Sequence, residues 1–174
     1  MIDRVCPGCG LRMPVRERAS YDGYYNCSAE CWDVYTEVLG AEFGDAVLFG
    51  QVHQLTVDAY AAQHAGGRHP DKSVAIHLAG LYLMLERGVR PASVPPLLQE
   101  LAAKVSDWPH FPPPEVDWSV TVLDVALTGS SNEHADRSRE WAAAVWRGWS
   151  IHHDAIARFV VAHLVIGALP ISQR

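Results

Sequence analysis

Two short cysteine pairs, Cys6-Pro-Gly-Cys9 and Cys27-Ser-Ala-Glu-Cys31, contain every cysteine of the 174-residue chain. A tetrahedral structural zinc takes four thiolates from two such pairs joined by a spacer. Pro7, Gly8 and Gly10 allow the tight turn that directs both sulfurs of the first pair toward one ion. We therefore expect Cys6, Cys9, Cys27 and Cys31 to bind one structural zinc ion.

Two other uses of the cysteines remain open at this point. Two disulfides would form in an oxidising compartment, but the first residues, Met1-Ile2-Asp3-Arg4, have no apolar stretch typical of a signal peptide. A redox-active CxxC motif would follow a strand in a βαβ unit, which the sequence does not predict. Zinc binding fits the spacing and the expected cytoplasmic location better than either alternative.

A hairpin and a helix are expected around the second cysteine pair. The segment Tyr21-Asp22-Gly23-Tyr24 places an Asp-Gly turn between aromatic residues, which is typical of a hairpin. Ser28 is a good N-cap for a helix that runs to about Leu39 and stops at Gly40. The order knuckle, hairpin, helix resembles a treble-clef zinc finger. Residues 1–40 are therefore predicted to form a small zinc-binding unit.

From Asp45 onward, the apolar residues recur at helical spacing. Helices are predicted over residues 48–62, 74–85, 94–105 and 133–164, with a short fifth helix near the end of residues 118–127. The proline-rich residues 106–114 should instead be extended. The sequence thus predicts a mainly α protein, in which a bundle of four to five helices over residues 45–170 carries the N-terminal zinc unit.

The composition excludes several classes of protein. A formal net charge of −6 argues against a general nucleic-acid binder, because neutralising phosphates needs clustered Lys and Arg. The longest apolar runs, residues 75–85 and 159–169, are shorter than the roughly 20 residues that cross a bilayer. We expect a small molecule or a protein as the partner, and no membrane.

Nine histidines are many for a chain of this length, and several fall inside predicted helices. His77 and His152 lie on apolar stripes, where an unpaired imidazole would be costly, whereas His53 lies beside its stripe. One hypothesis is that His53, His77 and His152 bind a second divalent metal in the bundle, with Asp58 assisting proton transfer. The alternative is that each imidazole forms a hydrogen bond with a neighbour and binds no metal.

Five segments together resemble an uncharacterised bacterial family of zinc-knuckle proteins, a domain of unknown function. They are Cys-Pro-Gly-Cys-Gly (6–10), Ser-Ala-Glu-Cys-Trp (28–32), Val-His-Gln-Leu-Thr-Val-Asp-Ala-Tyr-Ala-Ala-Gln-His (52–64), Val-Ala-Ile-His-Leu (74–78), and Trp141, Trp146 and Trp149 followed by His152-His153. This resemblance spans nearly the whole chain and implies no particular reaction.

A looser likeness is to the DinB-like helical bundles, in which three histidines hold a divalent metal that some members use for thiol transfer. That likeness implies the same role for His53, His77 and His152. The paired histidines one turn apart on a late helix, which are typical of those bundles, are missing here, and a four-cysteine zinc unit is not part of that fold.

The sequence therefore leaves two functions open. The first is an enzyme, in which a histidine-bound metal supports hydrolytic or thiol-transfer chemistry and Asp58 is catalytic. The second is a non-catalytic, zinc-stabilised protein-interaction or regulatory module, favoured because the sequence contains no complete catalytic motif such as G-x-S-x-G or H-E-x-x-H. About two metals per chain would favour the first and about one zinc the second.

Overall fold

The computed structural model describes residues 3–17 and 19–165, and within them the protein is mainly α-helical, as predicted. The helices are α1 (Ala29–Gly44), α2 (Ala46–Gln63), α3 (Asp71–Leu85), α4 (Val94–Lys104), α5 (Val122–Ala126), α6 (Ser131–Gly148) and α7 (His153–His163). Two short 3-10 helices, η1 (Pro91–Ser93) and η2 (Ser150–His152), and two antiparallel strands, β1 (Asp3–Val5) and β2 (Arg12–Pro14), complete the described elements.

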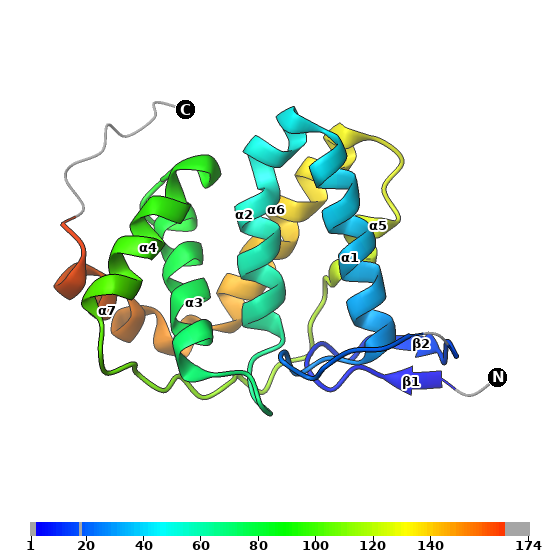
Figure 1. Ribbon diagram of the computed structural model, residues 1–174, viewed down its shortest axis with the longest axis horizontal. Coiled ribbons are helices and arrows are strands. Elements are labelled where there is room, and N and C mark those ends of the chain that lie inside the picture. Colours follow the sequence, from blue (N-terminus) through cyan, green and yellow to red (C-terminus); the bar gives the residue numbers. More distant parts are fainter. Residues whose placement is uncertain (1–2, 18, 166–174) are drawn as a thin grey trace.

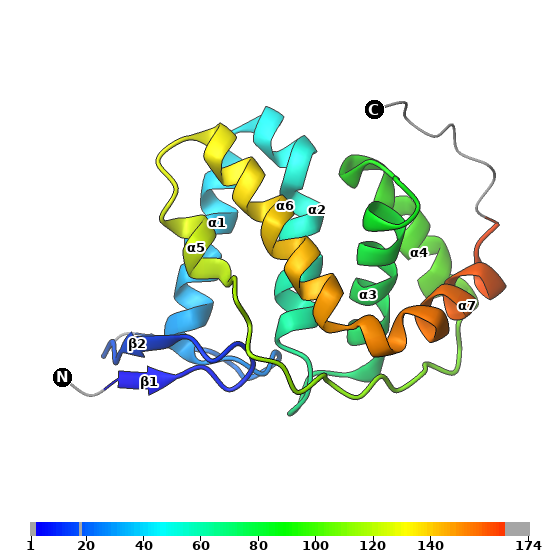
Figure 2. The same ribbon diagram turned by 180° about the vertical axis from the view of Figure 1, so that it is seen from behind.

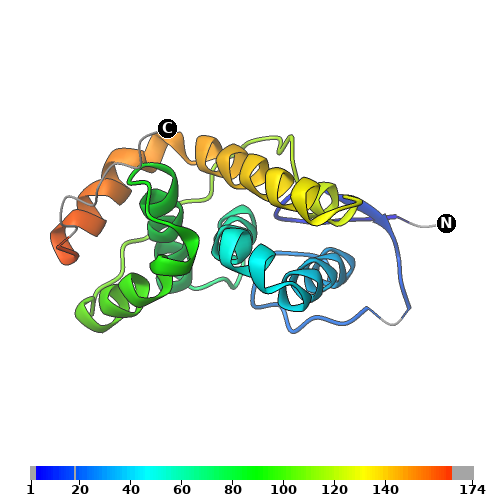
Figure 3. The same cartoon turned by 90° about the horizontal axis from the view of Figure 1, so that it is seen from above.

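Helices α4, α3, α2 and α1 lie side by side across the broad face of the molecule (Figure 1). From behind, α6 is seen to cross over α2, while α7 lies with α3 and α4 (Figure 2). The view from above shows α2 between α1 and α3 (Figure 3), and α1 and α2 run antiparallel (Figure 1). As a result, the C-terminal end of α2 returns to the N-terminal end of α1, beside the β1–β2 hairpin (Figure 1).

One hydrophobic core extends through the predicted zinc unit and the predicted bundle. It includes Cys6 and Met13 near the N-terminus together with Trp141 and Trp149 of the C-terminal half. The division into a unit of residues 1–40 and a bundle of residues 45–170 stays a prediction, and residues 166–170 lie outside the described part of the chain. Among the described residues, no helix combines the length and the apolar character that crossing a membrane requires.

Hydrogen bonds satisfy the polar atoms of the buried tryptophans. The Nε1–H of Trp141 donates to Oε1 of Gln63 (3.0 Å), and the Gln63 amide donates in turn to the carbonyl of Val120 (2.9 Å). The Nε1–H of Trp149 donates to the carbonyl of Ala62 (3.3 Å). These bonds anchor the last turn of α2 to α6 and to the segment that precedes α5, where buried polar groups would otherwise be costly.

Side chains cap the first two helices, at Ser28 as predicted and at Asp45. The Ser28 hydroxyl accepts the N–H of Cys31 (3.2 Å), and Asp45 Oδ1 accepts the N–H groups of Val47 and Leu48 (3.0 and 3.1 Å). The predicted stop at Gly40 is wrong, because α1 continues to Gly44. The extra turn places Glu42 in the interior, where hydrogen bonds to α2 and α6 compensate for the helical glycine.

Two further predictions differ from the structure. Residues 21–24 contain no strand and lead into a bend over residues 23–26; the strand pair instead flanks the first cysteine pair. The predicted helix over residues 133–164 is interrupted after Gly148 by η2, so α6 and α7 run in different directions (Figure 2). At Gly148 the ring of Trp118 comes so close that an added Cβ would lie 2.5 Å from its Cζ3 atom. The chain thus turns at a glycine that Trp118 covers, and α7 packs on α3 and α4 instead of continuing the direction of α6.

Candidate metal centre

Four side chains converge where the β1–β2 hairpin meets the ends of α1 and α2. They are Cys6, Cys9, Cys31 and His64; all are buried, and their ligand atoms lie within 4.8 Å of one another. The Sγ atoms of Cys9 and Cys31 are 3.8 Å apart, and Cys31 Sγ is 3.4 Å from His64 Nε2. A tetrahedral zinc with bonds of ~2.3 Å to sulfur and ~2.05 Å to nitrogen requires separations of about 3.8 and 3.6 Å. The observed spacing therefore fits one ion of this size.

The first two cysteines lie on a tight turn between β1 and β2. The Cys6 N–H donates to the Leu11 carbonyl (2.8 Å), and the Gly10 N–H donates to the Cys6 carbonyl (2.9 Å). Gly10 has a positive φ of 75°, which a glycine adopts without strain. At Gly8 an added Cβ would lie 2.7 Å from Cδ2 of His64, so only glycine allows the turn to approach the imidazole this closely.

Cys31 lies in the first turn of α1, three residues after the Ser28 cap. The partial positive charge of a helix N-terminus favours a thiolate at this position. The Tyr60 hydroxyl, from α2, also donates a hydrogen bond to Cys31 Sγ (3.7 Å). Both contacts stabilise negative charge on the sulfur, as a metal ligand requires.

His64 is the residue that caps the C-terminal end of α2. Its Nδ1–H donates to the carbonyl of Tyr60 (2.8 Å), which leaves Nε2 directed at the cysteines. Metal-binding histidines are commonly oriented by such a bond from the other ring nitrogen. The Asn26 N–H donates to the His64 carbonyl (3.0 Å) and attaches the loop before α1 to the same point.

The electrostatics of the cysteines suit a divalent cation. Hydrogen bonds with Cys31 and Cys9 lower the pKa of Cys6 below its usual range, whereas hydrogen bonds with Cys6 and Cys9 raise the pKa of Cys31. One thiolate thus forms readily, but further ionisation is opposed, because like charges repel strongly in a buried site. A divalent cation would remove this repulsion and allow all three thiols to ionise.

Cys27, expected as the fourth ligand, does not belong to this group of four; His64 takes that place. Cys27 is half-buried in the turn that precedes α1, where its N–H donates to the Tyr25 carbonyl (2.9 Å). Burial raises the pKa of its thiol to about 11, so it is a neutral thiol near pH 7. His64 was missed because it lies 33 positions after Cys31, too far for a local motif. The one available signal was a histidine at a helix end just before Gly66-Gly67.

The three histidines expected at a second metal lie in different places, each with a partner of its own. The Nδ1–H groups of His53 and His77 donate to Glu42 Oε2 and Asp58 Oδ1, each at 2.7 Å. The Nε2–H of His152 donates to the Pro112 carbonyl (3.0 Å). Within the described residues these three do not form a group able to hold a metal ion. Each makes instead the kind of contact that the alternative interpretation predicted.

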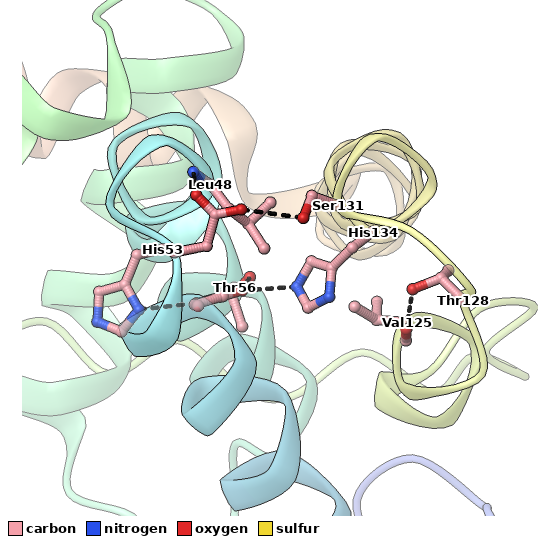
Figure 4. A network of polar contacts seen from close by, with 9 residues as sticks. Leu48, His53, Thr56, Val125, Thr128, Ser131 and His134 are labelled. Carbon is pink, nitrogen blue, oxygen red and sulfur yellow. Dashed lines mark hydrogen bonds and ion pairs between the residues drawn. The ribbon is translucent and has the colours of Figure 1, made fainter.

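Glu42 is the centre of a buried polar network. Its carboxylate accepts hydrogen bonds from Nδ1 of His53, from the Thr56 hydroxyl (2.5 Å) and from Nε2 of His134 (3.1 Å). Figure 4 shows His53 and Thr56 approaching from α2 and His134 from α6. Burial opposes ionisation, but these three bonds bring the pKa of Glu42 below its ordinary value. The network therefore joins α1, α2 and α6 through one carboxylate.

Asp58 is fully buried between α2 and α3. Its Oδ1 accepts bonds from His77 and from the Gln54 amide (2.9 Å), whereas no partner for Oδ2 was found within the described part of the chain. Burial raises the pKa of Asp58 despite the bond from His77. An added Cβ at Gly80 would overlap Oδ2, so this carboxylate depends on a glycine in the facing helix.

Comparison with known proteins identifies a family but no activity. Neither the curated proteins nor the solved structures include a significant match to this chain. The comparisons therefore give no support for a likeness to DinB-like bundles. The profile of a family described as a family of unknown function, DUF5946, matches residues 4–150, a range that includes all four residues of the metal centre. The chain therefore belongs to the DUF5946 family, in agreement with its resemblance to an uncharacterised family.

Proposed function

We propose that the protein is a zinc-stabilised binding module in which Cys6, Cys9, Cys31 and His64 hold one structural zinc ion. The observation that carries the proposal is the closed, buried set of four protein ligands at tetrahedral spacing. Catalytic zinc sites keep one position open for water or substrate, whereas structural sites use four protein ligands. Three thiolates also favour zinc over harder cations such as magnesium or calcium.

The ion would join three parts of the chain that are distant in sequence. Cys6 and Cys9 come from the hairpin, Cys31 from the start of α1 and His64 from the end of α2. A segment as short as residues 3–28 contains too few apolar residues to fold by itself, so metal binding would contribute directly to its folding free energy. The treble-clef resemblance stays a prediction: the knuckle precedes a helix, but residues 21–24 contain no strand and the last ligand would come from a second helix.

A second candidate function is the enzyme, and one pair of residues favours it. Asp58 holds one imidazole nitrogen of His77, while the His77 side chain remains 15% exposed. A buried carboxylate that orients a histidine is an arrangement used both for proton transfer and beside metal ions. Any second metal at His77 would need ligands other than His53 and His152, which are engaged elsewhere.

Elemental analysis of the purified protein tests the two candidates together. The binding module predicts about one zinc per chain, lost on Cys31→Ser and retained on His77→Ala. His110→Ala is the matched control, because His110 is an exposed histidine paired with Asp71. A second equivalent of metal that His77→Ala removes and His110→Ala does not would overturn the module in favour of the enzyme.

A further inference from the structure

A pocket of about 430 Å³ lies beside the metal centre, between the loop that precedes α1 and the first turn of α1. Its lining consists of Ser20, Tyr21, Asp22, Tyr24, Tyr25 and Trp32. Pockets for small ligands usually measure roughly 300–1,000 Å³, so the space is sufficient for one. Four of its six lining residues are aromatic, and the other two, Ser20 and Asp22, are polar.

The aromatic rings are held in place from behind. Tyr25 packs edge-on against Tyr60 (5.5 Å between ring centroids), and Trp32 packs against Tyr35 (5.4 Å). Tyr24 meets Tyr25 at an interplanar angle of 89°, which forms a corner, and Tyr24 itself is 44% exposed. The inner contacts fix these rings while the pocket remains open to solvent.

One acidic side chain supplies charge at the pocket. Asp22 is the only charged residue in the described lining, and its Oδ1 accepts the N–H of Tyr24 (3.0 Å), which fixes its position. Arg68 approaches the turn at Gly23 but does not line the pocket. Aromatic rings with a carboxylate and without a lining cation favour a positively charged ligand.

We propose that this pocket binds a methylated ammonium group, with the aromatic rings facing the methyl groups and Asp22 balancing the charge. Ring faces attract cations, and sets of aromatic side chains recognise quaternary ammonium ligands in this way. Methyl groups carry part of the positive charge and give it an apolar surface, so a methylated ammonium can lie against the four aromatic rings with less loss of hydration than a free amine. The inference rests on the proposed binding function, because Trp32 directly follows the metal ligand Cys31.

The first test compares a cation with its neutral isostere on the zinc-loaded full chain. Choline and 3,3-dimethylbutan-1-ol have the same shape and differ in charge. Isothermal titration should show choline binding about tenfold more tightly, as cation–π attraction of ordinary strength predicts. Equal affinity for the two compounds, or no choline binding, would overturn the proposal.

A second titration distinguishes two sources of the same ammonium chemistry. A short capped peptide containing trimethyl-lysine that binds more tightly than choline would identify a methylated polypeptide as the ligand. Choline binding at least as tightly as the peptide would identify a free small molecule. Both outcomes retain a site for methylated ammonium, whereas equal binding of the unmethylated lysine peptide would overturn it.

Variants connect the binding to the pocket. Tyr24→Leu and Asp22→Asn should each weaken choline binding by at least about threefold, and Asp22→Asn keeps an oxygen that can accept the Tyr24 N–H. Phe43→Leu is the control, because Phe43 is an aromatic side chain, 68% exposed, at the opposite end of α1. Unchanged choline affinity in both pocket variants would overturn the proposal.

Zinc content is measured for each protein in the same experiment. Wild-type protein that holds one zinc but does not bind choline would refute the pocket and leave the structural zinc intact. Wild-type protein without zinc would refute the proposed function itself. If Tyr24→Leu lowers the zinc content, the test rests on Asp22→Asn, which removes only a charge from an exposed side chain.

Discussion

Replacing His64 by alanine should release the metal, whereas replacing Cys27 by serine should leave it bound. His64 Nε2 lies 3.4 Å from Cys31 Sγ inside the group of four ligands. Cys27 lies outside that group, with a thiol that burial keeps neutral. The two substitutions therefore change neighbouring residues, but only His64→Ala is expected to lose the metal.

The expected loss of zinc affinity in His64→Ala follows from dividing the binding free energy of the ion equally among its four ligands. Structural zinc binds with roughly 10–16 kcal/mol in small zinc-binding peptides, so an equal share per ligand is about 2.5–4 kcal/mol. That share corresponds to zinc binding that is about 10²–10³-fold weaker in His64→Ala. The variant also loses the hydrogen bond from Nδ1 to the Tyr60 carbonyl, about 1 kcal/mol of folding stability. For Cys27→Ser we expect a change in zinc affinity of less than about threefold.

Competition with a chromophoric zinc chelator measures both affinities, and circular dichroism shows whether the helices remain folded. Loss of zinc from Cys27→Ser, together with full retention in His64→Ala, would refute the reasoning and restore the site with four cysteines. The double variant Cys27→Ser/His64→Ala tests whether Cys27 can replace His64 as a ligand. If His64→Ala retains zinc only because Cys27 replaces the imidazole, the double variant should lose the metal that the single variant keeps.

Three other substitutions follow from buried contacts. Gly8→Ala should weaken zinc binding and lower the free energy of unfolding by about 1–3 kcal/mol, as urea titration would show, because its Cβ meets the His64 ring. Gly80→Ala should destabilise the protein more, by about 3 kcal/mol, and a double-mutant cycle with Asp58→Ala should recover part of that loss; strict additivity would contradict the overlap. The pKa of Glu42 is lower in the folded protein than in the unfolded chain, where it is about 4.3. Ionised Glu42 therefore stabilises the fold above that pH, and this contribution is lost as the pH falls through the pKa of the folded state. Glu42→Gln should therefore lower stability near neutral pH and reduce its loss on acidification, and an unchanged acid profile measured by denaturant titration would contradict this role.

The helices were predictable wherever neighbouring residues specify them. The Ser28 cap, the apolar stripes and the prolines before α5 all act within a few positions of the chain, so their effects can be read directly from the order of residues. The errors occur at Gly40 and Gly148, where local preference is weak. Contacts of Glu42 with other helices carry α1 past the first glycine, and at the second the chain turns so that α7 packs on α3 and α4.

In the metal centre, too, some features follow from neighbouring residues and others only from the packing of helices. The spacing of Cys6, Cys9 and Cys31 predicts a metal-binding segment, because a turn and a helix start can bring these thiols together over a short length of chain. That His64 rather than Cys27 lies with these three cysteines is decided by the packing of α1 against α2. The two helices have 16 and 18 residues, about 24 and 27 Å, and only Asp45 separates them. An antiparallel pair of such similar lengths returns the end of α2 to the start of α1, and this return places the imidazole of His64 beside the Cys31 sulfur.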